Sequence, residues 1–256
     1  MTWFEAIILG IIQGLTEFLP ISSSGHLVLA QHFMDIHERG MLLEVILHIG
    51  TLTAIIAYYW DDLNKIARDV FNGVAETRNY VMYLTVATVP AVFVGLLLDE
   101  YLESIFIPSV AVTMLFITGL ILAASYFSIK RPIRKFTFFI SFCIGISQAC
   151  ALLPGISRSG ITISFALLMG IKHNEAAKFS FFMAIPVLLG AGLLQMIRID
   201  HLEQITIFPL IIGFLSAAMT GYLVIDLLLA VISKGKYYLF SLYCFTIVII
   251  YYILIN

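Results

Sequence analysis

Two stretches of this chain, residues 10–25 and 145–160, repeat one pattern 135 positions apart, and each interrupts an apolar segment with Pro, Ser and Gly. The first copy reads GIIQGLTEFLPISSSG and the second reads GISQACALLPGISRSG. Pro, Ser and Gly break helices, and inside a membrane unwound backbone persists only where it lines a cavity or a binding site. The two breaks therefore predict one site, formed where the two halves of the chain meet.

The composition restricts the class of protein. Hydrophobic residues make up 61% of the chain and charged residues 12%, whereas about a quarter of the residues of a soluble domain are charged. A polytopic membrane protein is the class that fits, and no basic block indicates nucleic-acid binding. The three cysteines lie in apolar segments without the spacing of a metal site, so we interpret them as packing residues.

The apolar segments predict the number of helices. Stretches of spanning length, roughly 17 to 25 residues, lie at about 41–60, 80–98, 108–129, 179–198, 207–232 and 237–255. Two further apolar regions, about 4–34 and 137–170, contain the breaks near their middles. We therefore predict an all-α polytopic membrane protein with six full transmembrane helices and two re-entrant helix hairpins. It forms a single membrane domain over residues 1–256, with inverted-topology repeats at approximately 1–129 and 137–256.

The distribution of positive charge predicts the orientation. Of the 14 Lys and Arg residues, 11 lie in four loops, at 61–79, 130–136, 171–178 and 233–236. The positive-inside rule places these loops in the cytoplasm. Region 137–170 lies between two of them, so it must enter and return on the same side. If region 4–34 is likewise a hairpin, it enters from outside and both termini are external. If it crosses the membrane fully, the N-terminus is cytoplasmic.

The first break carries polar side chains at helical spacing. Gln13 and Glu17 are four positions apart, so both project from one face of the incoming helix. Pro20 ends that helix, and Ser22 or Ser23 is a natural N-cap for the next one. The free N–H groups and positive dipole at a helix N-terminus form an anion site.

The second break adds a fixed cation. An Arg at membrane depth costs at least about 2.5–3.5 kcal/mol on insertion scales, so Arg158 requires an anionic partner or ligand. Its guanidinium, with the hydroxyls of Ser157 and Ser159, has the donor groups of a phosphate site. Glu17 of the first break could hold a divalent cation or act as an acid or base. His26 follows the first cap by three or four residues and returns to the same face.

The strings QGLTEFLPISSSGH and PGISRSGIT resemble the two signature motifs of the undecaprenyl-diphosphatase (bacitracin-resistance) family of bacterial membrane enzymes. The similarity in length, loop pattern and the LHIGTL stretch at 47–52 covers essentially the whole chain. It implies hydrolysis of undecaprenyl diphosphate to undecaprenyl phosphate and inorganic phosphate, which recycles the lipid carrier of cell-wall synthesis and confers bacitracin resistance. It also implies dependence on Mg²⁺ or Ca²⁺, and a site that opens to the outer face of the plasma membrane.

The resemblance also implies roles for individual residues. The catalytic residues would be Glu17, Ser23, His26 and Arg158. Residues around the diphosphate would be Gln13, Ser22, Ser157, Ser159 and Thr162. Glu17 would also be the metal ligand. Many members of the family have Glu where this chain has Gln13, so this chain has one carboxylate fewer at the first motif.

The residues leave alternatives open. The nucleophile could be Ser23 activated by His26, which we favour, or His26 itself, or a water molecule. A different class of function is a transporter or flippase of a polyprenyl phosphate or small anion, because inverted repeats with broken helices are typical of transporters. A transporter has no need of acid–base groups such as Glu17 and His26. A structural scaffold gains nothing from burying Arg158. His48, deep on an apolar segment, is a weaker candidate for the site.

Overall fold

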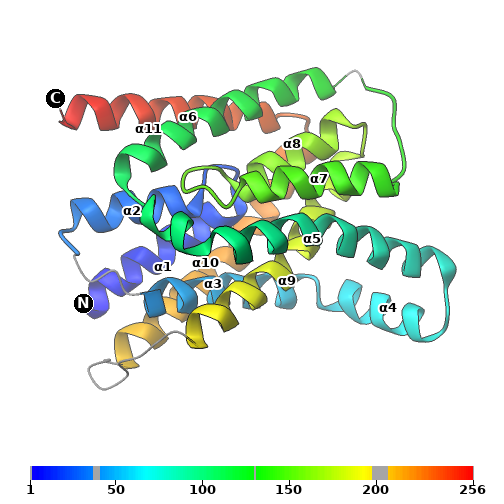
Figure 1. Ribbon diagram of the computed structural model, residues 1–256, viewed down its shortest axis with the longest axis horizontal. Helices are drawn as coiled ribbons and strands as arrows, with labels where there is room; N and C mark the ends of the chain where they lie inside the picture. The colour runs from blue at the N-terminus through cyan, green and yellow to red at the C-terminus, as the bar shows by residue number, and fades with distance from the viewer. Residues whose placement is uncertain (1, 37–40, 130, 198–206, 256) are drawn as a thin grey trace.

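The computed structural model describes residues 2–36, 41–129, 131–197 and 207–255. Within these residues the regular secondary structure is helical, and no β-strand is present. The α-helices are α1 (Trp3–Phe18), α2 (Ser23–Phe33), α3 (Met41–Tyr58), α4 (Trp60–Phe71), α5 (Ala75–Ser104), α6 (Pro108–Ala124), α7 (Phe138–Cys150), α8 (Arg158–Leu168), α9 (His173–Ile197), α10 (Ile207–Ser233) and α11 (Phe240–Ile255) (Figure 1). Two short 3₁₀ helices are η1 (Ser125–Ser128) and η2 (Tyr237–Leu239).

Long apolar helices confirm that the chain is an all-α, multi-pass membrane protein. Five helical segments of the described residues are long and apolar enough to cross a membrane: Ala75–Leu98, Pro108–Ser128, His173–Gln195, Ile207–Ser233 and Tyr237–Leu254. A sixth span requires the bent pair Leu42–Tyr58 and Trp60–Phe71. The helices on either side of each break are shorter, with 16 residues in α1, 11 in α2, 13 in α7 and 11 in α8.

The region expected to span the membrane at about 41–60 ends in a sharp bend. α3 stops at Tyr58, and α4 leaves at an angle of 71° through the loop expected at 61–79. Asp61 and Asp62 lie in the first turn of α4 and Arg68 in its last, which suits the helix dipole. Its apolar and charged residues lie on separate faces, so α4 has the character of a helix lying along an interface.

Both predicted breaks are present. Leu19 ends α1 in an extended conformation, and Ser22, with a φ of 70°, precedes α2. In the second break Gly155 has a φ of +97°, and a Cβ there would lie 2.0 Å from the backbone oxygen of Ala111. This position therefore requires glycine for both its dihedral angle and its space.

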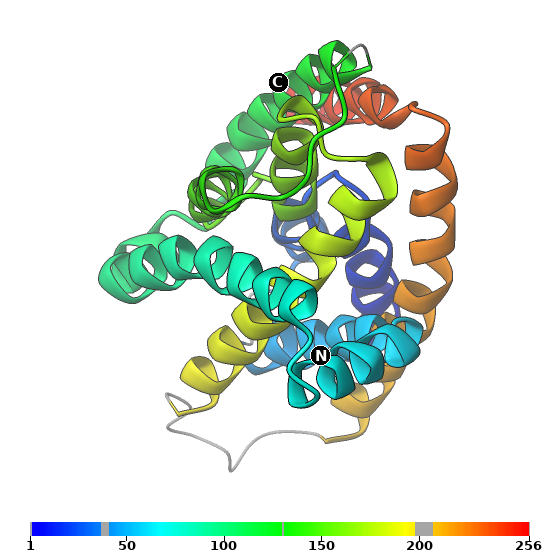
Figure 2. The ribbon, with the colours of Figure 1, turned by 90° about the vertical axis from the view of Figure 1, so that its right-hand side faces the viewer.

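Each half of the chain packs against the other. α1 lies along α10, α7 along α5, α6 along α11, and α3 against α9. Small residues allow the closest approach: a Cβ on Gly14 of α1 would lie 2.8 Å from the backbone oxygen of Ala217 in α10. Likewise, a Cβ on Gly145 of α7 would lie 2.7 Å from the oxygen of Ala87 in α5. The end-on view in Figure 2 shows α1, α2 and α8 surrounded by other helices.

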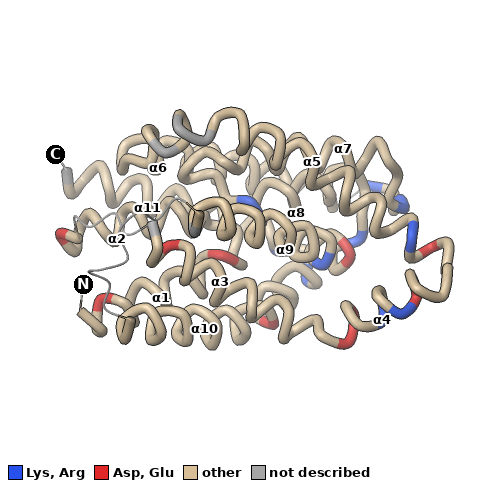
Figure 3. The backbone as a smooth tube through the Cα atoms, turned by 60° about the horizontal axis from the view of Figure 1, so that its bottom comes forward, with Lys and Arg blue, Asp and Glu red and all other residues tan. Residues whose placement is uncertain are grey.

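The charged residues and the chain ends mark two opposite ends of the molecule. Most Lys and Arg residues of the described chain gather at one end, around α4 and the adjoining ends of α5 and α9 (Figure 3). Both termini lie at the other end (Figures 1 and 3). α1 and α2 extend from the end with the termini to a turn in the middle, whereas α7 and α8 extend from the basic end.

Candidate functional site

The first break is held by a serine cap at the start of α2. Ser22 is the N-cap residue, and its Oγ accepts a hydrogen bond from the backbone N–H of Gly25 at 3.2 Å. The same Oγ lies 3.3 Å from the Oγ of Ser24. These contacts confirm the predicted cap at the start of α2.

The second break repeats these contacts at the start of α8. Ser157 is the N-cap residue, its Oγ accepts from the N–H of Gly160 at 3.0 Å, and it lies 3.3 Å from the Oγ of Ser159. Each contact joins residues that occupy the same places in the sequence pattern as those of the first break. Two helix N-termini are therefore built in the same way.

The two turns touch each other. The backbone N–H of Gly155 donates to Ser24 Oγ at 3.4 Å, and Ser159 Oγ donates to the backbone oxygen of Leu19 at 3.3 Å. A Cβ on Gly25 would lie 3.2 Å from the Cα of Gly155. The prediction that the two breaks meet at one place is consistent with these contacts.

An ion pair joins the two halves at this place. The Nη2 atom of Arg158 lies 2.5 Å from Glu17 Oε1, and its Nη1 donates to the backbone oxygen of Ser180 at 3.3 Å. The side chains of Glu17 and Arg158 are 5% and 14% exposed. Glu17 lies in the last turn of α1 and Arg158 is the first residue of α8, so the carboxylate of one break neutralises the cation of the other. Arg158 has the anionic partner that its depth requires.

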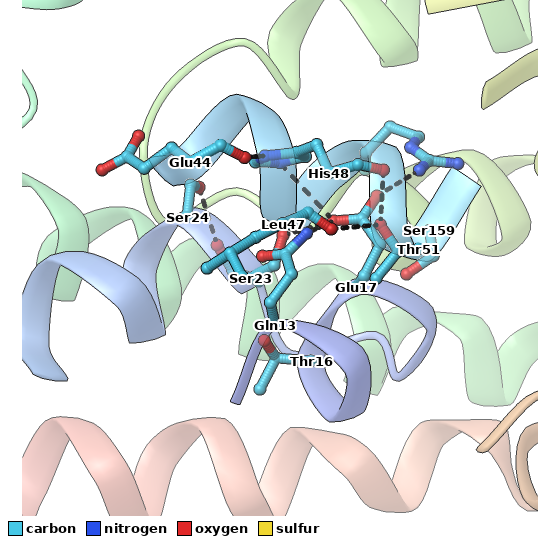
Figure 4. Close-up of polar contacts among 12 residues, drawn as sticks. Gln13, Thr16, Glu17, Ser23, Ser24, Glu44, Leu47, His48, Thr51 and Ser159 are labelled. Carbon is cyan, nitrogen blue, oxygen red and sulfur yellow. Dashed lines mark hydrogen bonds and ion pairs between the residues drawn. The ribbon is translucent and has the colours of Figure 1, made fainter. Parts of the chain in front are cut away.

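The second carboxylate oxygen of Glu17 accepts hydrogen bonds from side chains of the first break (Figure 4). Its Oε2 accepts from Ser23 Oγ at 2.6 Å and from Gln13 Nε2 at 3.2 Å. The Gln13 side chain is fully buried, and its Oε1 has no hydrogen-bond partner among the described residues. Ser23 is therefore paired with a carboxylate, which differs from the Ser23–His26 pair that we favoured from the sequence.

His26 has other partners. Its Nδ1 lies 2.8 Å from the backbone oxygen of Ser22, and its Nε2 lies 3.0 Å from the hydroxyl of Tyr243 on α11. Both ring nitrogens are thus engaged, and a bond to Ser23 is not among the hydrogen bonds of the described residues. Tyr243 is 217 positions away on an apolar helix, and nothing in its sequence surroundings distinguishes it.

His48 lies closer to the site than its sequence indicated. Its Nε2 is 3.9 Å from Glu17 Oε2, and its Nδ1 lies 2.7 Å from the backbone oxygen of Glu44 (Figure 4). The bond to Glu44 fixes the orientation of the ring on α3. His48 therefore belongs to the polar cluster around Glu17, which the LHIGTL stretch alone did not establish.

In this structure, the residues of the second break that were predicted to contact phosphate bind other groups of the protein. Ser157 and Ser159 make the cap contacts above, and both are buried. Thr162 Oγ1 donates to the backbone oxygen of Arg158 at 2.7 Å and lies 2.7 Å from the Oγ of Ser180. These contacts fix the position of Arg158. A direct contact of these hydroxyls with phosphate stays a prediction.

An apolar pocket of about 300 Å³ adjoins the first break. It lies between α1, α2 and α11, and His26 and Tyr243 are part of its lining. Other lining residues are Ile12, Leu15, Leu29, Phe33, Ile247 and Leu254. The polar cluster around Glu17 and this apolar pocket together suit a ligand with a charged head and an apolar chain.

Among the described residues, no group of three or more His, Cys, Asp or Glu side chains could hold a metal ion. The oxygen donors near the ion pair are Glu17 Oε2, Ser23 Oγ and the unpartnered Gln13 Oε1. A hard divalent cation binds oxygen and commonly takes one or two protein carboxylates together with substrate phosphates. The donor set therefore fits such a cation when a phosphorylated ligand supplies further oxygens.

Comparison with known proteins gives a consistent result. The family model described as bacitracin resistance protein BacA matches residues 6–250. A protein of Halothermothrix orenii named undecaprenyl-diphosphatase is 38% identical over 259 residues, covering 99% of this chain and 98% of the relative. Proteins with the same name from Bacteroides thetaiotaomicron and Caldicellulosiruptor bescii are 36% and 38% identical, covering 95% and 99% of this chain and 96% and 99% of the relatives. The chain belongs to the bacitracin resistance protein BacA family.

Proposed function

We propose that this protein is an undecaprenyl-diphosphatase of the bacterial plasma membrane, which hydrolyses undecaprenyl diphosphate to undecaprenyl phosphate and inorganic phosphate. This reaction returns the lipid carrier to cell-wall synthesis and confers resistance to bacitracin. The observation that carries the proposal is the cluster of Arg158, Glu17 and Ser23, formed at the contact of two helix breaks. The names of the relatives agree with it.

The cluster has the charge that phosphoanhydride cleavage requires. The transferred phosphoryl group carries negative charge on its oxygens, and catalysis depends on groups that stabilise this charge in place. Arg158 supplies a fixed cation, and the N-terminal turns of α2 and α8 supply N–H groups and positive dipole ends. A ligand phosphate can take the place of Glu17 on part of the Arg158 guanidinium, because that group has five donors.

Ser23 is the nucleophile in this proposal, and Glu17 is its base. Ser23 Oγ attacks the terminal phosphorus while its proton passes to Glu17 Oε2, which already accepts it at 2.6 Å. The bond from that phosphorus to the bridging oxygen breaks, and undecaprenyl phosphate leaves with the bond electrons. Water then cleaves the phosphoserine, which releases inorganic phosphate and restores the Ser23 hydroxyl. This scheme replaces His26 by Glu17 as the base.

The lipid chain occupies the apolar pocket beside the cluster. The pocket between α1, α2 and α11 reaches His26, so a chain lying in it brings the phosphate attached to the lipid next to His26. The terminal phosphate then extends toward Ser23 and Arg158. The arrangement favours an amphiphilic substrate with a phosphorylated head.

A divalent cation, Mg²⁺ or Ca²⁺, completes the proposed site. Glu17, with Gln13 Oε1 beside it, would hold the ion. When bound, such an ion neutralises negative charge on the phosphate oxygens. Because the Gln13 amide is neutral, Glu17 would be the charged ligand that α1 provides to the cation.

The membrane topology of the proposal is a pair of inverted repeats, each with one re-entrant hairpin and three spans. Support comes from the matched caps of Ser22 and Ser157, and from helix pairs that extend into the molecule from opposite ends. The basic end would be cytoplasmic. Both termini would then be external, and α1 and α2 would open the site to the outer face.

The decisive experiment is phosphate release from a long-chain polyprenyl diphosphate by the purified protein. We expect turnover by the unaltered protein, and loss of turnover with a chelator and in Glu17→Ala and Arg158→Ala. Full turnover by both variants would exclude the proposed site. A transporter or flippase would move a polyprenyl phosphate across vesicles without releasing phosphate. Mass spectrometry of a trapped phosphoenzyme on Ser23 supports the proposed nucleophile, whereas an adduct on His26 excludes it.

A further inference from the structure

Tyr243 contacts His26 in two ways. Its hydroxyl lies 3.0 Å from His26 Nε2, and the two rings are stacked with centroids 5.7 Å apart and an interplanar angle of 19°. Tyr243 belongs to α11 in the second half of the chain, whereas His26 belongs to α2 in the first. The pair thus links the two halves at a position separate from the Arg158–Glu17 ion pair.

The partners of His26 determine which ring nitrogen carries the proton. The backbone oxygen of Ser22, 2.8 Å from Nδ1, can only accept a hydrogen bond, so Nδ1 must donate. In the neutral ring Nε2 then has the lone pair, and the Tyr243 hydroxyl is the donor to it. The two bonds together fix both the tautomer and the rotation of the ring.

The stacked rings of His26 and Tyr243 lie where the apolar pocket adjoins the first helix break. His26 and Tyr243 both line the pocket, and Ser22, which binds Nδ1, is the cap of the break. A lipid chain in the pocket therefore lies against both rings. Nε2 is the ring nitrogen of His26 that faces Tyr243, the second of these two lining residues.

We propose that Tyr243 is a positioning residue of the phosphatase site. Its hydroxyl holds His26 in the tautomer with the proton on Nδ1 and keeps Nε2 directed to the pocket, beside the phosphate that stays on the lipid. The inference rests on the proposed function, since it concerns the same substrate. Tyr243 acts through His26, so its removal alters His26 and leaves the Glu17–Arg158 pair intact.

Kinetics of Tyr243→Phe test the role of the hydroxyl. Phe keeps the stacked ring and removes one hydrogen bond, so we expect kcat to fall about tenfold while KM changes by less than about twofold. Tyr252→Phe is the matched control, because Tyr252 lies on the same helix, is 49% exposed and lies outside the described lining of the pocket; its kcat should stay unchanged. Equal kcat in Tyr243→Phe and the unaltered protein, or an equal loss in both variants, would overturn the inference.

Nitrogen NMR of the ¹⁵N-histidine-labelled protein gives a readout that does not depend on turnover. His26→Asn identifies the His26 signals by their absence. We expect a protonated Nδ1 and an unprotonated, hydrogen-bonded Nε2 in the unaltered protein, and a shift of the Nε2 signal in Tyr243→Phe but not in Tyr252→Phe. A proton on Nε2 alone, or an unchanged spectrum in Tyr243→Phe, would contradict the inference. If the unaltered protein released no phosphate, the proposed function would fail, and these spectra would still decide the position of the proton.

Discussion

At the scale of single residues, the site depends on the buried positive charge of Arg158, which a carboxylate from the other half of the chain neutralises. Arg158 gains its partner Glu17 only when the two breaks meet, so the ion pair ties the position of the cation to the fold. Removing one member of a buried pair leaves the other unpaired, and this costs more than removing both. Stability and activity should therefore respond differently to single and double substitutions.

The first prediction concerns this pair. Arg158→Gln should lower the free energy of unfolding by about 3–5 kcal/mol, because Glu17 is left as an unpaired buried carboxylate. The double variant Glu17→Gln, Arg158→Gln should regain most of that stability and release no phosphate. Denaturation in detergent and the phosphate assay measure the two quantities. A double variant as unstable as Arg158→Gln would show that the pair does not govern stability.

A second prediction concerns the two glutamines at corresponding positions of the repeated pattern. Gln13→Glu adds a carboxylate beside Glu17, so the cation concentration for half-maximal activity should fall by about tenfold or more. Gln148→Glu is the control, because Gln148 Nε2 donates to the backbone oxygen of Ala87 and lies outside the proposed cation site. An equal effect of both substitutions would exclude Gln13 as a neighbour of the cation.

The sequence predicted the residues of the site better than their pairing. Helix caps are local, so Ser22 and Ser157 could be assigned from the Pro, Ser and Gly pattern alone. The partner of Ser23 could not, because Glu17 lies across a turn with an unusual φ at Ser22. Tyr243 could not be found either, since its contact with His26 joins two helices far apart in the chain.

At the scale of helices, close packing of α1 on α10 sets the position of Glu17. A Cβ on Gly14 would lie within 2.8 Å of backbone atoms of Ala217 and Gly221. Backbone atoms cannot move away as a flexible side chain can, so α1 itself would have to shift. Glu17 lies one turn after Gly14 and would move with the helix.

The third prediction tests this packing. Gly14→Ala should lower the free energy of unfolding by about 1–3 kcal/mol, as expected for overpacking, and should reduce phosphate release because Glu17 is displaced. Gly190→Ala in α9 is the control, since a Cβ there meets no atom of the described chain within 4 Å. Its stability should be unchanged or higher by up to about 1 kcal/mol. Thermal unfolding in detergent measures both, and equal stability of the two variants would contradict the packing argument.

The sequence also predicted the apolar spans at α5, α6, α9, α10 and α11, because long apolar runs have few alternatives. It did not predict α4 or the bend before it. The charged residues at 61–79 predicted a loop because of their composition. An amphipathic helix has the same composition as such a loop, and only the order of charged and apolar residues along the chain distinguishes the two. Helices were thus easiest to predict where a long apolar run determines them, and hardest where the order of charged and apolar residues does.

At the scale of the whole molecule, the two copies of the pattern share their scaffold and differ in their chemistry. The caps recur in both copies, and Gly25 recurs as Gly160. In contrast, Glu17 corresponds to Leu152, Ser23 to Arg158, and His26 to Ile161. A pair of similar turns can therefore form one asymmetric site, with the carboxylate and hydroxyl on one side and the guanidinium on the other. The proposed topology requires the two hairpins to enter the membrane from opposite faces.

The fourth prediction tests that requirement by thiol labelling of intact cells. In a chain whose three cysteines are replaced, a membrane-impermeant maleimide should label Thr2→Cys and Ser104→Cys directly, and Ser233→Cys only after permeabilisation. Ser104 and Ser233 form a matched pair, because each is exposed and each donates to the backbone oxygen three residues earlier. Ser104 lies at the end with the termini and Ser233 adjoins a basic loop, so the positive-inside rule places them on opposite faces. Thr2→Cys decides between the alternatives for region 4–34: a hairpin leaves it outside with Ser104→Cys, whereas a full crossing protects it together with Ser233→Cys and would exclude the inverted repeats.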